Sequence, residues 1–261
     1  MKDKLDNFVS GSRPSAFVIF IIMIMLSIMI VSSKSAQAED RHAANGKLVY
    51  DKYCVGCHGV KGDGKGAAAV NLLIKPRDLT QGLFKFKSTL AGSLPTDDDL
   101  KNSITNGLSP SSMPSFKFVP EDEKDDLVAY IKTLSPKWNI KTATKEFLKP
   151  TIPDFVGTKA SIATGKKIYE ERCVFCHGQD GVRDNVKFHL SWNDENSTDY
   201  TRPADFRYKT IKRGARVEDI YLSITIGVDG TPMPSFNETL SENDRWNLTS
   251  YVLSVMGKER R

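Results

Sequence analysis

The hydrophobic pattern begins with an apolar run over residues 16–31, in which Ser27 is the only polar residue. Basic side chains precede this run, and Ala36-Gln37-Ala38 offers an A-x-A cleavage site before Glu39. This arrangement predicts an export signal over residues 1–38, with the rest of the chain outside the cytoplasm. The 16 residues of the run are fewer than the roughly 20 that comfortably span a bilayer, so an uncleaved membrane anchor is the alternative.

Two later segments have the pattern of helices and resemble each other. Residues 45–53 and 164–172 each start at a residue that favours the helix N-cap, Asn45 or Thr164, and each leads directly into a cysteine. In each predicted helix a glycine and the tyrosine four positions later share one face, which lets another helix cross closely. These residues are Gly46 and Tyr50, and Gly165 and Tyr169.

The crossing partners are predicted near the end of each repeat. Four apolar residues fall at helical spacing, and the same pattern returns 121 residues later. The two sets are Leu127, Tyr130, Ile131 and Leu134, and Leu248, Tyr251, Val252 and Val255. Each half of the chain is therefore predicted to begin and end with a helix.

The stretch between the two halves keeps neither helical nor strand periodicity. It contains Pro136, Pro150 and Pro153 and is predicted to be an interdomain linker. Short motifs between the helices also recur in both halves, so duplication of one domain is the simplest explanation. The expected organisation is a signal peptide or anchor over residues 1–38, a first domain over 39–135, a linker over 136–163 and a second domain over 164–261.

The pattern C-x-x-C-H occurs at residues 54–58 and again at 173–177, 119 residues later. It holds a haem through two thioethers and one axial imidazole. Two disulfides would not explain why a histidine directly follows the second cysteine of each pair. In a four-cysteine zinc site the two C-x-x-C pairs usually lie much closer together in the sequence. Two covalently attached haem c groups with iron are therefore predicted. The attachment residues are Cys54, Cys57 and His58, and Cys173, Cys176 and His177.

Two methionines are candidates for the second axial position on each iron. Met113 and Met233 lie 55 or 56 residues after the histidine of their motif and directly before a proline. Proline stiffens the loop and helps to hold a weak thioether ligand in place. Met256 has no such context and is predicted to fill the core. The predicted iron ligands are thus His58 with Met113, and His177 with Met233.

With these motifs, the chain from about residue 40 to the C-terminus resembles two class I cytochromes c in tandem. The resemblance implies an all-α fold of two small helical domains, each around one covalently bound haem c. It also implies the same histidine and methionine pairs as axial ligands. In that family a glycine-aromatic helix at the start of the domain crosses an aromatic helix at its end. The crossing residues carried over by motif are Gly46, Tyr50 and Tyr130, and Gly165, Tyr169 and Tyr251.

Histidine and methionine together fill both axial positions, which favours one-electron transfer over substrate binding. The chain is therefore expected to be a periplasmic electron-transfer protein of a respiratory chain rather than an enzyme, with redox proteins as donor and acceptor. A membrane tether over residues 16–31 would instead make it the diheme subunit of an oxidase, a reductase or a quinol-oxidising complex. A diheme peroxidase-like enzyme is the other alternative, and it would need one axial position to open. His42 and His189 are the remaining histidines.

Charge adds a weaker indication about partners. The formal net charge is +5, and no basic stripe with interleaved aromatic residues occurs, so nucleic-acid binding is not expected. Acidic residues concentrate in the first domain and basic residues in part of the second, which could orient the molecule between donor and acceptor. The acidic set is Asp97, Asp98, Asp99, Glu121, Asp122, Glu123, Asp125 and Asp126, and the basic set is Arg202, Arg207, Lys209, Lys212, Arg213 and Arg216.

Overall fold

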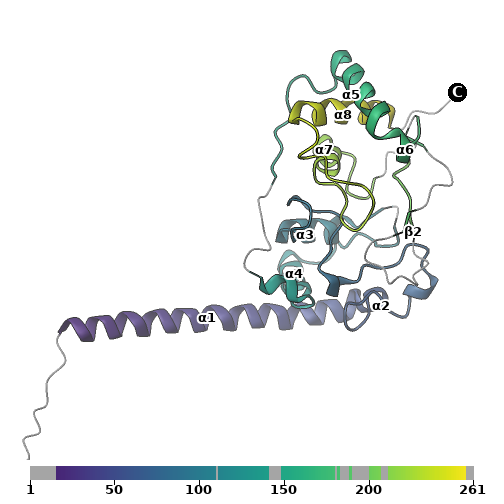
Figure 1. Ribbon diagram of the computed structural model, residues 1–261. Coiled ribbons are helices and arrows are strands. Elements are labelled where there is room, and N and C mark those ends of the chain that lie inside the picture. Colours follow the sequence, from purple (N-terminus) through teal and green to yellow (C-terminus); the bar gives the residue numbers. More distant parts are fainter. Residues whose placement is uncertain are drawn as a thin grey trace, which may run out of the picture. The chain divides into compact units, whose positions relative to one another are not determined.

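The structure, a computed structural model, describes residues 16–109, 111–140, 148–179, 181–182, 188–189, 200–206 and 211–256. The chain forms two compact units, residues 1–41 and residues 42–261. Both C-x-x-C-H motifs lie in the second of these units (Figure 1).

The first helix, α1, spans Ala16–Tyr53 and ends directly before Cys54. The expected helix start at Asn45 is wrong, because Asn45 lies inside this helix. No glycine or proline occurs between residues 16 and 45, so the helix continues through the polar stretch that follows the apolar run. Among the described residues, no helix combines the length and the apolar character needed to cross a membrane.

The first repeat continues from α1 with short helices and loops. Its elements are α2 (Val55–His58), the 3-10 turns η1 (Ala69–Asn71) and η2 (Leu79–Gln81), α3 (Asp97–Asn106), α4 (Glu121–Thr133) and the 3-10 turn η3 (Pro136–Asn139). A capping box between Thr96 and Asp99 starts α3. Acidic side chains in the first turns of α3 and α4 complement the helix dipoles, so the acidic set has a structural role at the ends of these helices.

The second repeat has the same order of helices. Its elements are α5 (Lys159–Arg172), α6 (Val174–His177), β1 (Phe188–His189), β2 (Tyr200–Thr201), α7 (Val217–Ile226) and α8 (Glu242–Val255). The helix α5 starts at Lys159 and not at Thr164, because the Thr158 hydroxyl accepts a hydrogen bond from the Ser161 backbone N–H and caps the helix earlier. The strands β1 and β2 form one antiparallel pair of two residues each. The regular structure of the described residues is otherwise helical, which confirms the all-α class.

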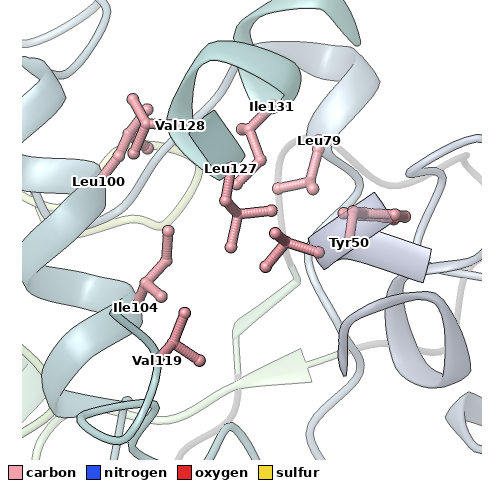
Figure 2. Close-up of a cluster of buried hydrophobic side chains, with 9 residues drawn as sticks. Tyr50, Leu79, Leu100, Ile104, Val119, Leu127, Val128 and Ile131 are labelled. Atoms are coloured by element: carbon pink, nitrogen blue, oxygen red, sulfur yellow. The ribbon is translucent and has the colours of Figure 1, made fainter. Parts of the chain in front are cut away.

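In the first repeat α1 crosses α4 at Gly46, as the sequence motifs predict. A Cβ atom at Gly46 would collide with the backbone carbonyl of Asp126 in α4. The rings of Tyr50 and Tyr130 pack beside this crossing with 5.1 Å between their centroids. Figure 2 shows Leu127 directed from α4 toward Tyr50 in the core. The buried residues of this core are Val49, Tyr50, Leu79, Leu100, Ile104, Val119, Leu127, Val128 and Ile131.

The second repeat forms the same crossing between α5 and α8, which lie side by side (Figure 1). A Cβ atom at Gly165 would collide with the backbone carbonyl of Asn247, and the rings of Tyr169 and Tyr251 lie 5.0 Å apart between centroids. The predicted glycine and tyrosine pairs are thus confirmed in both repeats. Met256 is buried, as expected for a core residue. The buried core here consists of Tyr169, Phe206, Ile220, Ile224, Leu248, Tyr251, Val252 and Met256.

The described parts of the segment between the repeats lie against both of them. Trp138 packs on the core of the first repeat. The backbone N–H of Leu148 donates to the carbonyl of Ser88 over 2.9 Å. The backbone N–H of Gly157 donates to the Ser250 hydroxyl over 3.0 Å. These contacts tie the connecting segment to the two cores.

Candidate haem sites

Each C-x-x-C-H motif forms a short helical turn directly after a long helix. In the first motif the backbone N–H of His58 donates to the Cys54 carbonyl over 2.9 Å. The turn ends at Gly59, whose φ of 80° suits glycine. The second motif has the same turn, with 2.9 Å between the His177 nitrogen and the Cys173 carbonyl oxygen. In each motif, the two cysteines that could attach a haem and the histidine that could bind its iron are therefore held within one turn.

A buried tyrosine fixes each of these turns from the preceding helix. The Tyr50 hydroxyl donates to the Gly59 carbonyl over 2.7 Å, and the Tyr169 hydroxyl donates to the Gly178 carbonyl over 2.8 Å. Burial raises the pKa of Tyr50 well above its ordinary value, so its hydroxyl remains a neutral donor. The tyrosine that forms the helix crossing therefore also positions the motif.

The four cysteines are free thiols, so the disulfide alternative is not realised in the structure. Burial raises the pKa of Cys54 and of Cys173 to about 11. Both side chains are therefore neutral thiols, the group that c-type haem attachment converts to thioethers.

The first histidine is held in a defined tautomer. The Nδ1 atom of His58 donates a hydrogen bond to the backbone carbonyl of Arg77 over 3.0 Å. Burial lowers the pKa of His58, so the ring is neutral. A neutral imidazole that donates through Nδ1 leaves the lone pair of Nε2 available for a metal ion.

The second histidine has a related environment with different partners. Burial lowers the pKa of His177, while the backbone carbonyl of Ala204 opposes this shift. Ala204 follows a proline, just as Arg77 does in the first repeat. The His177 ring also stacks on Phe206, with 5.2 Å between centroids and 22° between the planes. This stacking fixes the ring orientation in the second repeat.

Each candidate methionine lies in a loop closed by equivalent hydrogen bonds. The Met113 carbonyl accepts from the Leu108 backbone N–H over 3.1 Å, and the Met233 carbonyl accepts from the Val228 N–H over 3.1 Å. The glycine that ends the preceding helix has φ of 68° or 73°, and in both repeats a Cβ atom there would press on the Met-Pro backbone. Close approach of backbone to backbone therefore sets the path of both methionine loops.

One continuous cavity of about 2140 Å³ borders both motifs. Apolar side chains, among them Leu100, Ile104 and Ile224, form part of its wall. These surroundings fit haem c: thiols for thioethers, imidazole and thioether groups for the iron, and apolar walls for the ring. All eight predicted site residues line the cavity: Cys54, Cys57, His58, Met113, Cys173, Cys176, His177 and Met233.

The other two histidines are not among the cavity residues that the structure describes. His42 is exposed, and its Nδ1 atom contacts the Asp126 carboxylate. His189 belongs to β1, and its side chain lies outside the described part of the chain. Within the described part of the chain, neither histidine is therefore seen in the cavity, where the peroxidase-like alternative would need a group beside the haem.

Cationic residues of the cavity were not anticipated as site residues. Arg77, Lys85 and Lys212 line it together with the haem candidates. Lys212 and Arg213 were predicted to belong to a basic surface of the second domain, but both are half-buried. Two other members of that predicted basic set, Arg207 and Lys209, lie outside the described residues. The position of Arg77 between the recurring proline and aspartate is the one sequence signal that could have indicated a site residue.

The comparisons with known proteins agree with this geometry. The family model for cytochrome c matches residues 43–135, and the model for cytochrome C oxidase, cbb3-type, subunit III matches residues 160–252. A solved chain of the Kuenenia stuttgartiensis reducing HAO-like protein complex is 35% identical, covers 81% of this chain and 96% of its own length, and superposes with a TM-score of 0.74. No curated protein matches the chain.

Cytochrome c domains indicate electron transfer by haem and imply covalently bound haem c with its iron. They are typically extracytoplasmic. The two matched segments each contain one C-x-x-C-H motif and one candidate methionine. The chain therefore belongs to the diheme cytochromes c and consists of two tandem cytochrome c domains.

Proposed function

We propose that the chain is a periplasmic carrier or relay subunit that passes single electrons between a donor protein and an acceptor protein of a respiratory chain. The observation that carries this proposal is the repeated geometry of the cavity wall. In both domains two cysteines, one histidine and one methionine line the same cavity. Two haem c groups, one in each domain, follow from that repetition.

In this proposal each haem has its own set of protein ligands. Cys54 and Cys57 attach the first haem, and His58 and Met113 bind its iron. In the second domain the same roles belong to Cys173, Cys176, His177 and Met233. The matching hydrogen bonds of the two turns and the two methionine loops support the same assignment in both domains.

When bound, haem would supply a one-electron iron couple that can exchange single electrons with a donor protein and an acceptor protein. The chain holds this couple without offering a place for substrate. Neutral, half-buried histidines provide one ligand, and the soft thioether of methionine favours the reduced state. Because protein side chains fill both axial positions, we infer a carrier and not an enzyme.

The domain division and the N-terminal segment complete the proposal. We assign residues 39–135 to the first domain, 136–163 to the linker with α5 extending into it, and 164–261 to the second domain. Residues 1–38 are proposed to be a signal peptide. N-terminal sequencing of the mature protein tests this assignment: Glu39 as first residue supports cleavage, and Met1 as first residue supports the tethered alternative.

The similar solved chain is part of a protein complex. We infer that the present chain likewise docks on a redox protein. Pull-down of the exported holoprotein from the same cells, followed by identification of co-purifying haem proteins, tests this inference. Purification of the chain without any haem protein would count against it.

Methionine substitutions test the ligand assignment. Met113→Leu and Met233→Leu preserve apolar volume but remove the sulfur, so each should leave both haems attached and open one axial position. Met256→Leu is the matched control, because Met256 is buried in the core away from the cavity wall. Absorption and electron paramagnetic resonance spectra should show a high-spin fraction in the first two variants and in neither the control nor the parent protein.

Unchanged spectra in Met113→Leu or Met233→Leu would show that another group binds that iron. A high-spin haem in the parent protein that reacts with peroxide would instead support the peroxidase-like alternative.

A further inference from the structure

The loop that carries Met233 has a carboxylate that its counterpart in the first domain lacks. Both loops are closed by the same backbone hydrogen bond to the methionine carbonyl, and in both a hydroxyl group, of Ser111 or Thr231, accepts a hydrogen bond from the methionine N–H. Two residues after the glycine that ends the preceding helix, the first loop has the exposed Ser109, whereas the second has Asp229. The Asp229 side chain is only 13% exposed. A carboxylate removed from solvent to this extent needs polar partners.

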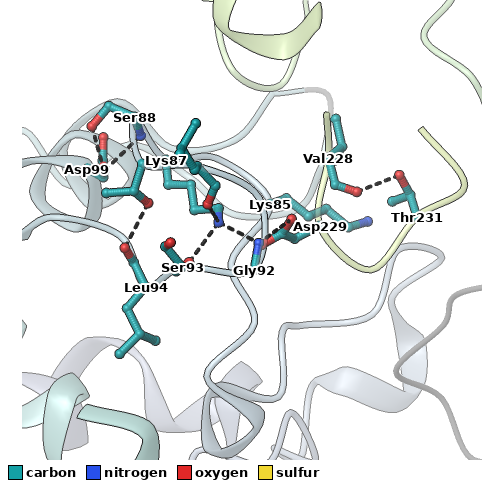
Figure 3. Close-up of polar contacts among 12 residues, drawn as sticks. Lys85, Lys87, Ser88, Gly92, Ser93, Leu94, Asp99, Val228, Asp229 and Thr231 are labelled. Carbon is teal, nitrogen blue, oxygen red and sulfur yellow. Dashed lines mark hydrogen bonds and ion pairs between the residues drawn. The ribbon is translucent and has the colours of Figure 1, made fainter. Parts of the chain in front are cut away.

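The first domain supplies partners of Asp229. The Lys87 ammonium lies 2.7 Å from the Asp229 carboxylate, and the backbone N–H of Gly92 donates to the same carboxylate over 3.2 Å (Figure 3). Only 2% of the Lys87 side chain is exposed. The ammonium also donates to the backbone carbonyls of Leu90 and Ser93, over 2.7 Å each. Each of its three protons therefore has an acceptor, which fixes the ammonium in its position beside Asp229.

The backbone around Lys87 is held by both domains. In the first domain, the Asp99 carboxylate in the first turn of α3 accepts hydrogen bonds from the backbone N–H and the hydroxyl of Ser88, over 2.9 Å each. From the second domain, the Arg213 guanidinium donates to the Lys87 carbonyl over 2.5 Å. A continuous series of polar contacts thus runs from α3 of the first domain to the methionine loop of the second.

Hydrogen bonds within the loop connect Asp229 to Met233, which lies four residues later. The Thr231 backbone N–H and hydroxyl donate to the carbonyl of Val228, directly before Asp229, over 3.1 and 2.7 Å. The Met233 backbone N–H donates to the Thr231 hydroxyl over 3.2 Å. A displacement of Asp229 would therefore disturb the bonds that place Met233.

We propose that Lys87 of the first domain is a positioning residue for Met233 of the second. Through Asp229 it holds the loop closed, so that the methionine sulfur stays on the second iron. An external ligand can bind that iron only when the loop has opened, and its apparent affinity falls with the fraction of open molecules. The first domain thereby limits how readily the second haem exchanges its axial ligand. This inference rests on the proposed function, since it takes Met233 as the ligand of the second iron.

Imidazole binding to the ferric holoprotein tests the proposal, because imidazole must displace the methionine sulfur. The Met113→Leu background leaves one methionine-to-iron absorption band, that of the second haem. In this background Lys87→Gln should raise the affinity for imidazole about tenfold, since a hydrogen bond to a charged group contributes roughly that factor to an equilibrium constant. Asp229→Asn keeps the shape of the side chain but removes its charge and should act in the same direction. Lys101→Gln removes the α3 partner of the exposed Asp125 and is the matched control.

The Met233→Leu background reports on the first haem in the same way, and there Lys87→Gln should leave imidazole binding unchanged. Affinities of Lys87→Gln and Asp229→Asn equal to that of Lys101→Gln, or an equal increase at both haems, would overturn the proposal. Failure of the proposed function would appear before imidazole is added, as a Met113→Leu or Met233→Leu variant that keeps both methionine-to-iron bands.

Discussion

Tyr50 and Tyr169 link the helix crossing to the haem motif in the two domains. Each ring packs against a tyrosine of the last helix. Each hydroxyl donates to the glycine carbonyl that follows the C-x-x-C-H turn. One side chain thus provides both apolar packing and a hydrogen bond that sets the position of the attachment turn.

Removal of this hydroxyl should have the same effect in both domains. Tyr50→Phe and Tyr169→Phe keep the ring but leave a buried carbonyl without its donor, which costs about 1 kcal/mol of folding free energy. Chemical denaturation of the holoproteins measures this cost. Equal stability of both variants and the parent protein would contradict the assigned role of the hydroxyl.

The chemistry of single residues could largely be predicted from the sequence. The C-x-x-C-H motif and the Met-Pro pair are each defined by neighbouring residues. In both domains the cysteines, histidine and methionine of these motifs line the cavity. The role of Arg77 could not be predicted, because its carbonyl accepts a hydrogen bond from a histidine 19 positions earlier in the sequence. Loop paths of that kind depend on the whole domain and not on a residue pattern.

The helix pairs depend on the absence of side chains at two glycines. Gly46 and Gly165 each face a backbone carbonyl of the crossing helix at a distance that excludes a Cβ atom. Spacing together with the family resemblance predicted both crossings: the spacing put a glycine and an aromatic residue on one helix face, and the resemblance named the crossing pairs. The starts of the helices were less predictable, since Asn45 and Thr164 are good N-caps that other residues of the same helix override.

A methyl group at the crossing should separate the helices. Gly46→Ala would force α1 and α4 apart and is expected to destabilise the first domain by about 2 kcal/mol. Gly56→Ala is the control, because nothing lies within 4 Å of a Cβ atom there. The equivalent position in the second motif carries Phe175, whose side chain is 77% exposed. Thermal unfolding should show a lower midpoint for Gly46→Ala and an unchanged one for Gly56→Ala, and equal midpoints would contradict the crossing.

A polar contact between the domains, formed by Lys87, Arg213 and Asp229 and here called the interdomain clamp, makes the two domains more than a pair of independent repeats (Figure 3). Its ion pair joins the loop after Phe86 to the loop that carries Met233, and both side chains are largely removed from solvent. No sequence pattern indicated this contact, because the two residues lie 142 positions apart and each reads as a surface charge. Contacts between domains depend on their relative placement, which periodicity does not encode.

Loss of one clamp partner should weaken the domain contact. Asp229→Asn would leave the buried Lys87 charge without its carboxylate and should cost about 3 kcal/mol. Asp125→Asn removes an exposed partner of Lys101 and should have no measurable effect. Denaturation of the two variants distinguishes these outcomes, and equal stability would show that the clamp contributes little.

The most direct measurement of the whole protein is a potentiometric titration of the holoprotein followed by absorption spectroscopy. Two haems with histidine and methionine ligands should take up two electrons per chain in one-electron steps. Both ferric haems should be low-spin, with a methionine-to-iron band that disappears as each is reduced. Uptake of one electron per chain, or a ferric haem without that band, would contradict the assignment of His58 with Met113 and His177 with Met233.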